Sequence, residues 1–333
     1  MPLICERDGV LAAYADAAAR GWVVPCFGSE NLTTSEAVLE AALRHAAELG
    51  IPDLPVTVAI TGAYPHRSQA SFYTHTRDVG LGLRLFLADL RELTTPGSPY
   101  ARLRVMPHFD HAQHDLDADT LASGAPGPWA SVMYDASTLP FAANIARTRT
   151  FVERWGHRVV IEGACDEIVD AGGGGGDLTS PERAAEYLAG TGVDLLVANL
   201  GTEHRASGAD LRYRGDLARA CSARVGGTLV LHGCSSVPPG ELGGLFADGV
   251  RKVNIWTMLE RDASPLLLAD LVANADKVAG ATAAALAGEG MLGPAAPVSG
   301  RAALSHCTTV HRQDLIHGAM TRIAARFFTM WYR

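Results

Sequence analysis

Lysine is scarce in this chain of 333 residues, in which only Lys252 and Lys277 occur although arginine is common. A lysine amine is the group that forms a Schiff base with a carbonyl substrate. Neither lysine lies at an obvious catalytic end of an expected strand. Schiff-base chemistry is therefore not expected.

Long apolar runs and paired cysteines are also missing. No run approaches the ~18 uninterrupted apolar residues of a membrane span, and the richest segment, 264–280, is broken by Asp270, Asp276 and Lys277. The opening MPLICERDGV carries charges where a signal peptide needs an apolar stretch. Six cysteines lie far apart without a CxxC pair. We expect a cytoplasmic protein with unpaired thiols and no membrane partner.

The formal net charge is −8, without long runs of like charge. A nucleic-acid partner is not expected, because the basic patch that binds phosphates is absent. Hydrophobic residues make up 48% of the chain, enough for an extensive core. The composition favours a globular protein that meets small molecules or other proteins.

Short apolar, β-branched runs alternate with helical patterns along most of the chain. They occur at 21–27, 54–60, 102–109, 129–135, 157–163, 193–201, 227–233 and 250–256. This alternation over roughly 235 residues predicts an α/β fold, a (β/α)₈ TIM barrel, with a doubly wound open sheet as the competitor. We expect one barrel domain over 1–333, with 259–333 a helical C-terminal extension.

Helix boundaries are indicated at two places. Thr33 and Glu36 have the spacing of a capping box, and Gly50 is a suitable stop for the same helix. Ser180 and Pro181 suit the N-cap and first position of a later helix. The glycine run at 170–177 precedes that helix and is interpreted either as a mobile active-site loop or as a plain surface loop.

Polar side chains gather where the expected strands end, which in a TIM barrel is the catalytic face. They are Asp110, His111, Asp135, Glu162, His204, His232 and Asn254. Three of them, His111, His204 and His232, are candidate ligands of one divalent metal that keeps open positions for a substrate. The alternative is that each histidine simply bonds to backbone.

Carboxylates and hydroxyls complete the expected site. Asp110 can exchange a proton with a substrate hydroxyl, or else orient an imidazole. We expect Asp135, Glu162 and His108 to support the ligands from behind. Ser235 and Ser236 suit an anion such as phosphate, although a helix-capping role is the alternative.

Several segments, in order, resemble the class II, zinc-dependent fructose-bisphosphate and tagatose-bisphosphate aldolase family. MPHFDHAQ is similar to its H-x-D-H segment, and SVMYDASTLPFAANI to its S-V-M-x-D-x-S-x-L block. VVIEG, the stretch from LTSPERAA to GTEH, LVLHG and KVNI match further family segments. The resemblance implies a divergent member of this family.

The resemblance implies one Zn²⁺ per chain on His111, His204 and His232, with Asp110 as the catalytic acid. Zinc would stabilise the enediolate of dihydroxyacetone phosphate or a related ketone while a bond to an aldehyde is made or broken. The substrate would be a phosphorylated ketose, or a ketone plus an aldehyde, and the assembly a homodimer or homotetramer. The residues expected to bind substrate are Gly233, Ser235, Ser236, Asn254 and Arg205.

Departures from the family pattern indicate a changed substrate. HGCSS stands where the family has H-G-G-S-G, and Trp256 stands where it has an acidic residue. Arg205 replaces a glycine, and its guanidinium suits a carboxylate or a repositioned phosphate. Ala164 replaces a glutamate, and GGGGGD replaces a glutamate-bearing loop, leaving Asp177 as the substitute proton carrier. Fructose 1,6-bisphosphate is expected to be a poor substrate.

Two other functions stay open at this point. A degenerate barrel that binds a metal or ligand without turnover would explain the lost loop glutamate, although Asp110 and the three histidines argue against it. A metal-dependent hydrolase on the same barrel would more naturally carry an H-x-H pair on its first strand, where this chain has VVPCF.

Overall fold

The computed structural model of the chain describes residues 3–122, 127–168, 177–204 and 213–333. Its eight parallel strands form a closed barrel in the order of the sequence, with β8 pairing back onto β1. This confirms the predicted (β/α)₈ barrel and excludes the open sheet. The strands are β1 (Val24–Gly28), β2 (Pro55–Thr61), β3 (Arg104–Gln113), β4 (Ser131–Asp135), β5 (Val160–Ala164), β6 (Leu195–Val197), β7 (Leu229–Leu231) and β8 (Val250–Ile255).

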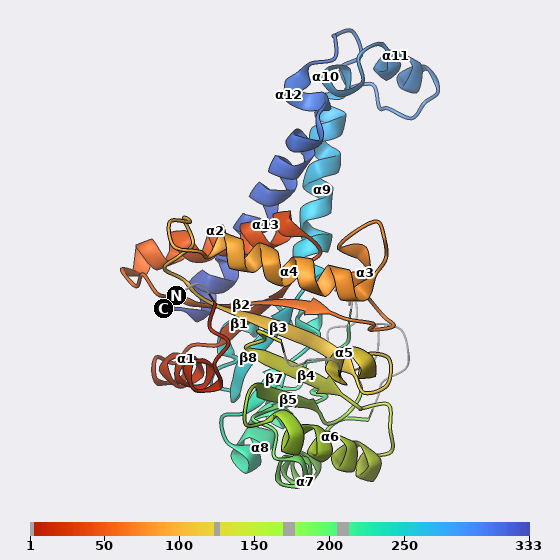
Figure 1. Cartoon of the computed structure of the whole chain (residues 1–333). Helices are drawn as coiled ribbons and strands as arrows, with labels where there is room; N and C mark the ends of the chain where they lie inside the picture. Colours follow the sequence, from red (N-terminus) through yellow and green to blue (C-terminus); the bar gives the residue numbers. More distant parts are fainter. Residues whose placement is uncertain (1–2, 123–126, 169–176, 205–212) are drawn as a thin grey trace.

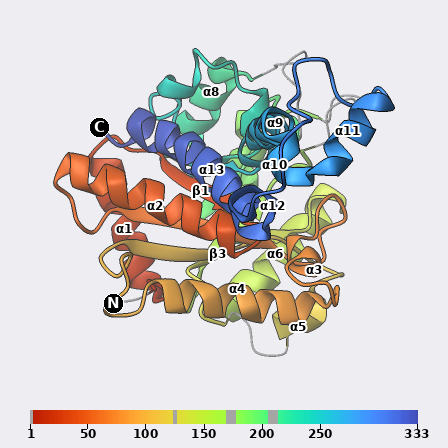
Figure 2. The same cartoon turned by 90° about the horizontal axis from the view of Figure 1, so that it is seen from above.

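Helices surround this barrel, as Figure 1 and Figure 2 show. Those of the barrel are α1 (Arg7–Ala19), α2 (Leu32–Leu49), α3 (Gln69–Phe72), α4 (Val79–Leu93), α5 (Ala118–Ala122), α6 (Phe141–Trp155), α7 (Pro181–Thr191) and α8 (Gly215–Val225). Two short 3₁₀ helices follow β7, η1 (Cys234–Ser236) and η2 (Leu242–Gly244). None of the helices in the described residues is long and apolar enough to cross a membrane.

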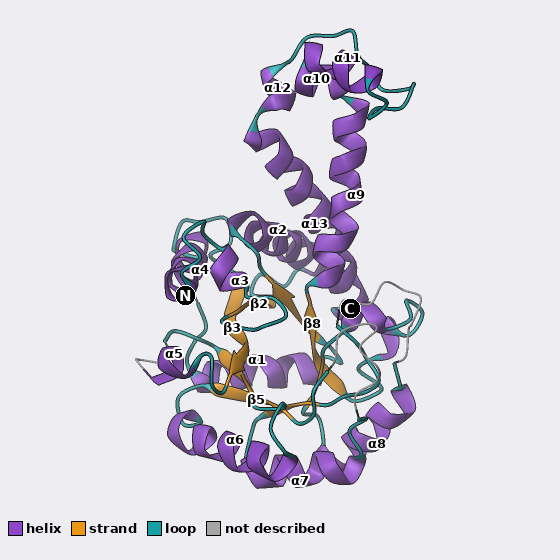
Figure 3. Ribbon diagram, turned by 90° about the vertical axis from the view of Figure 1, so that its right-hand side faces the viewer, coloured by secondary structure: helices purple, strands orange, loops and turns teal. Residues whose placement is uncertain are grey.

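A helical arm follows β8. It consists of α9 (Thr257–Ala273), α10 (Ala275–Ala279), α11 (Ala281–Gly288), α12 (Leu304–Cys307) and α13 (Thr309–Trp331). Figure 1 and Figure 3 show α9 leaving the barrel and α13 returning beside it, with α10 to α12 at the tip. The end of α13 packs on the barrel, where the Phe328 ring lies 5.5 Å from that of Phe27 in β1. The segment after β8 is helical, and the last turns of α13 complete the outer layer.

Local signals account for the helix ends with one correction. Asn31, and not Thr33, caps α2: its side chain accepts a hydrogen bond from the Thr34 amide. The capping-box prediction was wrong because asparagine two residues earlier offers the same acceptor in an extended backbone. Gly50 ends this helix in the left-handed conformation as expected, and Ser180 caps α7 with Pro181 at its start.

Candidate active site

Five of the polar residues at the strand ends, Asp110, His111, His204, His232 and Asn254, line one open cavity of about 680 Å³ at the C-terminal end of the barrel. It is lined by Gly28, Thr61, Tyr64, His66, Arg67, Gln69, Asp110, His111, His204, His232, Gly233, Cys234, Ser235, Asn254, Ile255, Trp256, Thr257 and Met258. Side chains from non-adjacent strands therefore face one space, as expected for a barrel of this kind.

A distortion of β3 turns two consecutive side chains into this cavity. Regular alternation would place His108 and Asp110 on one face and His111 on the other. The pairing of β3 with β4 shifts register between Phe109 and Ala112, and His111 has a φ of 46°. This left-handed conformation is costly for a residue with a Cβ and is typically found at functional sites. The bulge is what brings Asp110 and His111 to the cavity together.

The three histidines form a group that could hold a metal ion. One nitrogen of each of His111, His204 and His232 lies within 4.8 Å of the others, and His111 Nε2 is 3.2 Å from His232 Nδ1. His204 Nε2 is buried without a hydrogen-bond partner in the part of the chain that the structure describes. Burial, followed by the neighbouring imidazoles, holds the pKa of His204 well below its usual value. A neutral imidazole with a vacant nitrogen fits a metal ligand.

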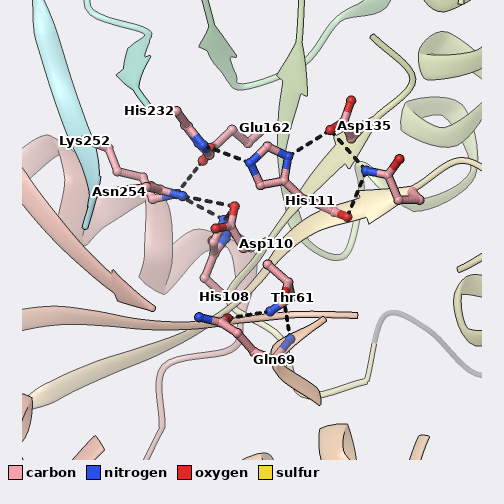
Figure 4. Close-up of polar contacts among 12 residues, drawn as sticks. Thr61, Gln69, His108, Asp110, His111, Asp135, Glu162, His232, Lys252 and Asn254 are labelled. Atoms are coloured by element: carbon pink, nitrogen blue, oxygen red, sulfur yellow. Dashed lines mark hydrogen bonds and ion pairs between the residues drawn. The ribbon is translucent and has the colours of Figure 1, made fainter. Parts of the chain in front are cut away.

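Carboxylates orient two of these imidazoles from behind (Figure 4). Asp135 Oδ2 lies 2.8 Å from His111 Nδ1 and also accepts a hydrogen bond from Gln113. Glu162 Oε1 lies 3.3 Å from His232 Nε2. Each contact leaves the other ring nitrogen facing the cavity, which is the usual arrangement behind a metal-bound histidine.

A buried lysine lies beneath this layer. Lys252 Nζ donates to Glu162 Oε2 at 2.6 Å and lies 3.2 Å from His108 Nε2. Burial raises the pKa of Glu162, but Lys252, His108 and His232 together outweigh this and bring the pKa to about 2. Sequence reasoning missed this role of Lys252, because nothing in the segment KVNI shows which side chain enters the barrel interior. Lys252 is paired with Glu162 and does not line the cavity, so it is unsuited to form a Schiff base with a substrate.

Asp110 is held next to the histidines by Asn254, whose Nδ2 donates to Asp110 Oδ1 at 3.0 Å. Burial raises the pKa of Asp110, but His111 and His108 outweigh burial and hold it well below its usual value. The carboxylate is thus ionised and able to accept a proton. Asn254 Oδ1 is buried without a hydrogen-bond partner among the described residues.

The turn after β7 forms another wall of the cavity. Gly233 has a φ of 67°, and a Cβ there would lie 2.7 Å from the Glu203 carbonyl oxygen. Ser235 Oγ is buried and has no hydrogen-bond partner within the described ranges, while Cys234 lines the cavity beside it. Ser236 instead donates to the Gly233 carbonyl and accepts from the Glu203 amide, so it holds the turn together.

Three further sequence predictions are not placed at the cavity. Asp177 is exposed just before α7 and is absent from the cavity wall. Arg205 lies outside the described residues, as does most of the glycine run at 170–177. The roles assigned to Asp177 and Arg205 stay predictions.

The segment between β2 and α3 contributes residues that sequence reasoning missed. The Tyr64 ring stacks on the His111 ring, with centroids 4.1 Å apart and planes 5° apart. His66 and Arg67 line the cavity beside it. The signal was their position directly after the second apolar run, a strand end that received no functional interpretation.

An unpaired carboxyl group lies in the first turn of α9. Glu260 Oε1 is buried and has no hydrogen-bond partner in the described chain. Burial, followed by the charge of Glu30, raises the pKa of Glu260 to about 7. Because this pKa is above its usual value, stability present at low pH is lost as the pH rises through about 7.

Ionisation of Glu260 is therefore expected to lower the free energy of unfolding of the wild type by about 3 kcal/mol between pH 4.5 and pH 8. The Glu260→Gln variant should not show this fall. Chemical denaturation of both proteins at several pH values measures it. The exposed Glu289→Gln variant is the control and should follow the wild type. Parallel curves for wild type and Glu260→Gln would contradict the assignment.

The family with the description "Fructose-bisphosphate aldolase class-II" matches residues 9–287. The structure agrees with this match: a closed barrel carries three histidines, Asp110 and Asn254 at its C-terminal end, where barrel enzymes have their active sites. The chain belongs to the class II fructose-bisphosphate aldolase family and is an aldolase, a carbon–carbon lyase. This sets aside both the non-catalytic barrel and the hydrolase.

Relatives of known name agree. The chain is 28% identical over 247 residues to the D-tagatose-1,6-bisphosphate aldolase subunit GatY of Klebsiella oxytoca, covering 72% of this chain and 78% of the relative. The fold matches a fructose-bisphosphate aldolase from Campylobacter jejuni with a TM-score of 0.73, 17% identity and 99% and 95% of the two chains covered. It also matches the YdjI aldolase of Escherichia coli K12, with a TM-score of 0.62, 17% identity and coverage of 96% and 95%.

Proposed function

We propose that this protein is a zinc-dependent aldolase that joins a phosphorylated ketone donor, dihydroxyacetone phosphate or a related ketone, to an aldehyde, or cleaves the product. One Zn²⁺ per chain would be held by His111, His204 and His232. The observation that carries the proposal is the convergence of these three imidazoles next to an ionised Asp110.

The residues present fit zinc. The 3.2 Å between His111 Nε2 and His232 Nδ1 suits two ligands of one zinc at Zn–N distances of about 2.0–2.1 Å, and a nitrogen of His204 lies within 4.8 Å of both, which leaves a fourth position open. Asp135 and Glu162 fix the ring orientation of two of these ligands. When bound, zinc would act as a Lewis acid on the ketone oxygen and neighbouring hydroxyl of the donor.

Asp110 would move the proton on the acceptor oxygen. In cleavage its carboxylate takes the proton from the hydroxyl that becomes the aldehyde, and in synthesis it returns it. Asn254 donates to Oδ1 of Asp110, so Oδ2 would be the oxygen that takes the proton. Asn254 Oδ1 has no hydrogen-bond partner among the described residues and is suited to accept a hydrogen bond from a substrate hydroxyl.

The donor phosphate would lie between the turn after β7 and the start of α9. Ser235 Oγ lacks a partner in the described chain, and Thr257, the first residue of α9, lines the same cavity. Backbone N–H groups at a helix N-terminus attract anions, and barrels often bind phosphate at this place. The backbone of Gly233 would contact the phosphate, while Ser236 would stabilise the turn through its hydrogen bonds to Gly233 and Glu203.

The test is to incubate the zinc-loaded protein with dihydroxyacetone phosphate in D₂O and follow its proton signals by NMR. We expect exchange of one carbon-bound hydrogen, because this half-reaction needs the donor site and a base, the role predicted for Asp177, but no aldehyde. Fructose 1,6-bisphosphate should be cleaved with a kcat/KM below ~10⁴ M⁻¹s⁻¹, the low end of ordinary enzymes. Absence of exchange would overturn the function, whereas efficient cleavage would overturn only the changed substrate.

We also propose the expected homodimer or homotetramer and the cytoplasmic location. Apolar side chains lie exposed on the arm, with Leu304 81%, Met291 69% and Leu268 64% accessible, which suits burial against another subunit. All six cysteines are unpaired, as in a reducing compartment.

A further inference from the structure

Three side chains from different strand ends form a polar and aromatic cluster on the β1, β2 and β8 side of the cavity. Trp256 Nε1 donates to Glu30 Oε1 at 2.8 Å. Arg67 donates to the same carboxylate from Nε at 3.1 Å and also from Nη2, and its guanidinium carbon lies 5.8 Å from the centre of the Trp256 ring. We call Glu30, Arg67 and Trp256 the Trp256 cluster. It fixes the indole in one orientation.

The backbone of β1 leaves room for this indole. A Cβ on Gly28 would lie 3.1 Å from Trp256 Cβ and 2.9 Å from Gln69 Nε2. Any side chain at Gly28 would therefore displace one of them. The tryptophan occupies a place that the neighbouring strand leaves open for it, so its ring is a built part of the cavity wall.

The position of the cluster assigns it to the acceptor. In the proposed function the donor phosphate lies by Ser235 and Thr257, which line the same cavity as the histidines. The wall formed by Gly28, Arg67 and Trp256 lies on the β8, β1 and β2 side of this cavity, next to Asn254, which donates to Asp110. An aldehyde whose oxygen meets Asp110 can extend along this wall.

The charges on this wall do not suit a second phosphate. Arg67 is the only lysine or arginine among the described residues that line the cavity, and its charge is already paired with Glu30. Glu260 adds a further carboxyl group close to the same pair. Among the described residues, this wall therefore offers a phosphate no uncommitted lysine or arginine, whereas the apolar faces of Trp256 and Met258 offer contact to a flat, uncharged group.

We infer that the acceptor is an uncharged aldehyde with an apolar, preferably aromatic, body that packs on Trp256, and that the Trp256 cluster determines this specificity. The inference rests on the proposed function, because it assigns the acceptor half of the same reaction. No bond is made by the cluster: it holds the aldehyde so that its carbonyl carbon meets the donor carbon, and Asp110 supplies the proton to the oxygen.

The first test compares acceptors at saturating dihydroxyacetone phosphate and one zinc per chain. Phenylacetaldehyde should exceed glyceraldehyde 3-phosphate in kcat/KM by at least about tenfold. Trp256→Ala should lower kcat/KM for phenylacetaldehyde by about 10–100-fold, the effect of losing one aromatic contact surface, and Trp256→Phe should retain most of it. Trp155→Ala, which removes a tryptophan from the outer end of α6, is the matched control and should leave the ratio of the two acceptors unchanged.

A second measurement needs no donor. Saturation-transfer NMR should show binding of 2-phenylethanol to the wild type and to Trp155→Ala, and loss of the signal in Trp256→Ala. The inference is overturned if glyceraldehyde 3-phosphate is the better acceptor, or if 2-phenylethanol binds Trp256→Ala as well as it binds the wild type. If the protein shows no donor hydrogen exchange but still binds 2-phenylethanol in a way that depends on Trp256, the result counts against the proposed function alone.

Discussion

Asp110→Asn is expected to slow carbon–carbon bond cleavage by about 10²–10⁴-fold, the range for loss of a general acid or base. Asparagine keeps the shape of the side chain but cannot take the proton from the hydroxyl that becomes the aldehyde. The contact with Asn254 is a hydrogen bond that an amide oxygen can still accept. Cleavage kinetics and zinc content are measured on the same preparation.

Zinc content should not change in this variant, since Asp110 is not one of the three ligands. Donor hydrogen exchange should fall less than cleavage, because it does not involve the proton on the acceptor oxygen. Normal cleavage by Asp110→Asn would show that the carboxylate only orients its neighbours. Loss of zinc with loss of activity would assign it to the metal site instead.

Replacing His204 with alanine should reduce bound zinc from about one per chain to near none. Removing a residue that only hydrogen-bonds to a metal ligand typically lowers metal affinity by roughly 10–100-fold. The loss of zinc affinity in His204→Ala should be larger, because one of the three direct ligands is gone. Elemental analysis after dialysis measures it, with the exposed His157→Ala variant as the control. Full zinc occupancy in His204→Ala would contradict the assignment of this histidine.

The barrel and the residues at its catalytic end were predictable because both depend on repeating patterns. Apolar runs alternating with helical segments indicate parallel strands, and parallel strands bring their C-terminal ends together. The positions of Asp110, His111, His204 and His232 in the sequence were therefore enough to place them at one end of the barrel.

Features that depend on non-local geometry could not be read from the sequence. Alternation along β3 would turn His111 away from Asp110, and only the bulge against β4 reverses this. The burial of Lys252 between Glu162 and His108 depends on how three strands face one another inside the barrel. The same holds for Trp256, whose ring reaches Glu30, a residue just after β1 and 226 positions away in the sequence.

Tyr64 and Arg67 were missed for a different reason. Both follow an apolar run, as the recognised site residues do, but neither is a common proton carrier or metal ligand. The stacking of Tyr64 on His111 and the pairing of Arg67 with Glu30 give them a place at the site. Strand ends are thus informative even where their side chains are not themselves reactive.

The most direct test of the central claim is a zinc titration of the metal-free protein, with donor hydrogen exchange in D₂O followed at each addition. Exchange should be near zero without metal, rise in proportion to added Zn²⁺ and reach its maximum at one zinc per chain. Over the same range His204→Ala should show almost none. Full exchange in the metal-free protein, or an unchanged titration in His204→Ala, would contradict a single catalytic zinc on His111, His204 and His232.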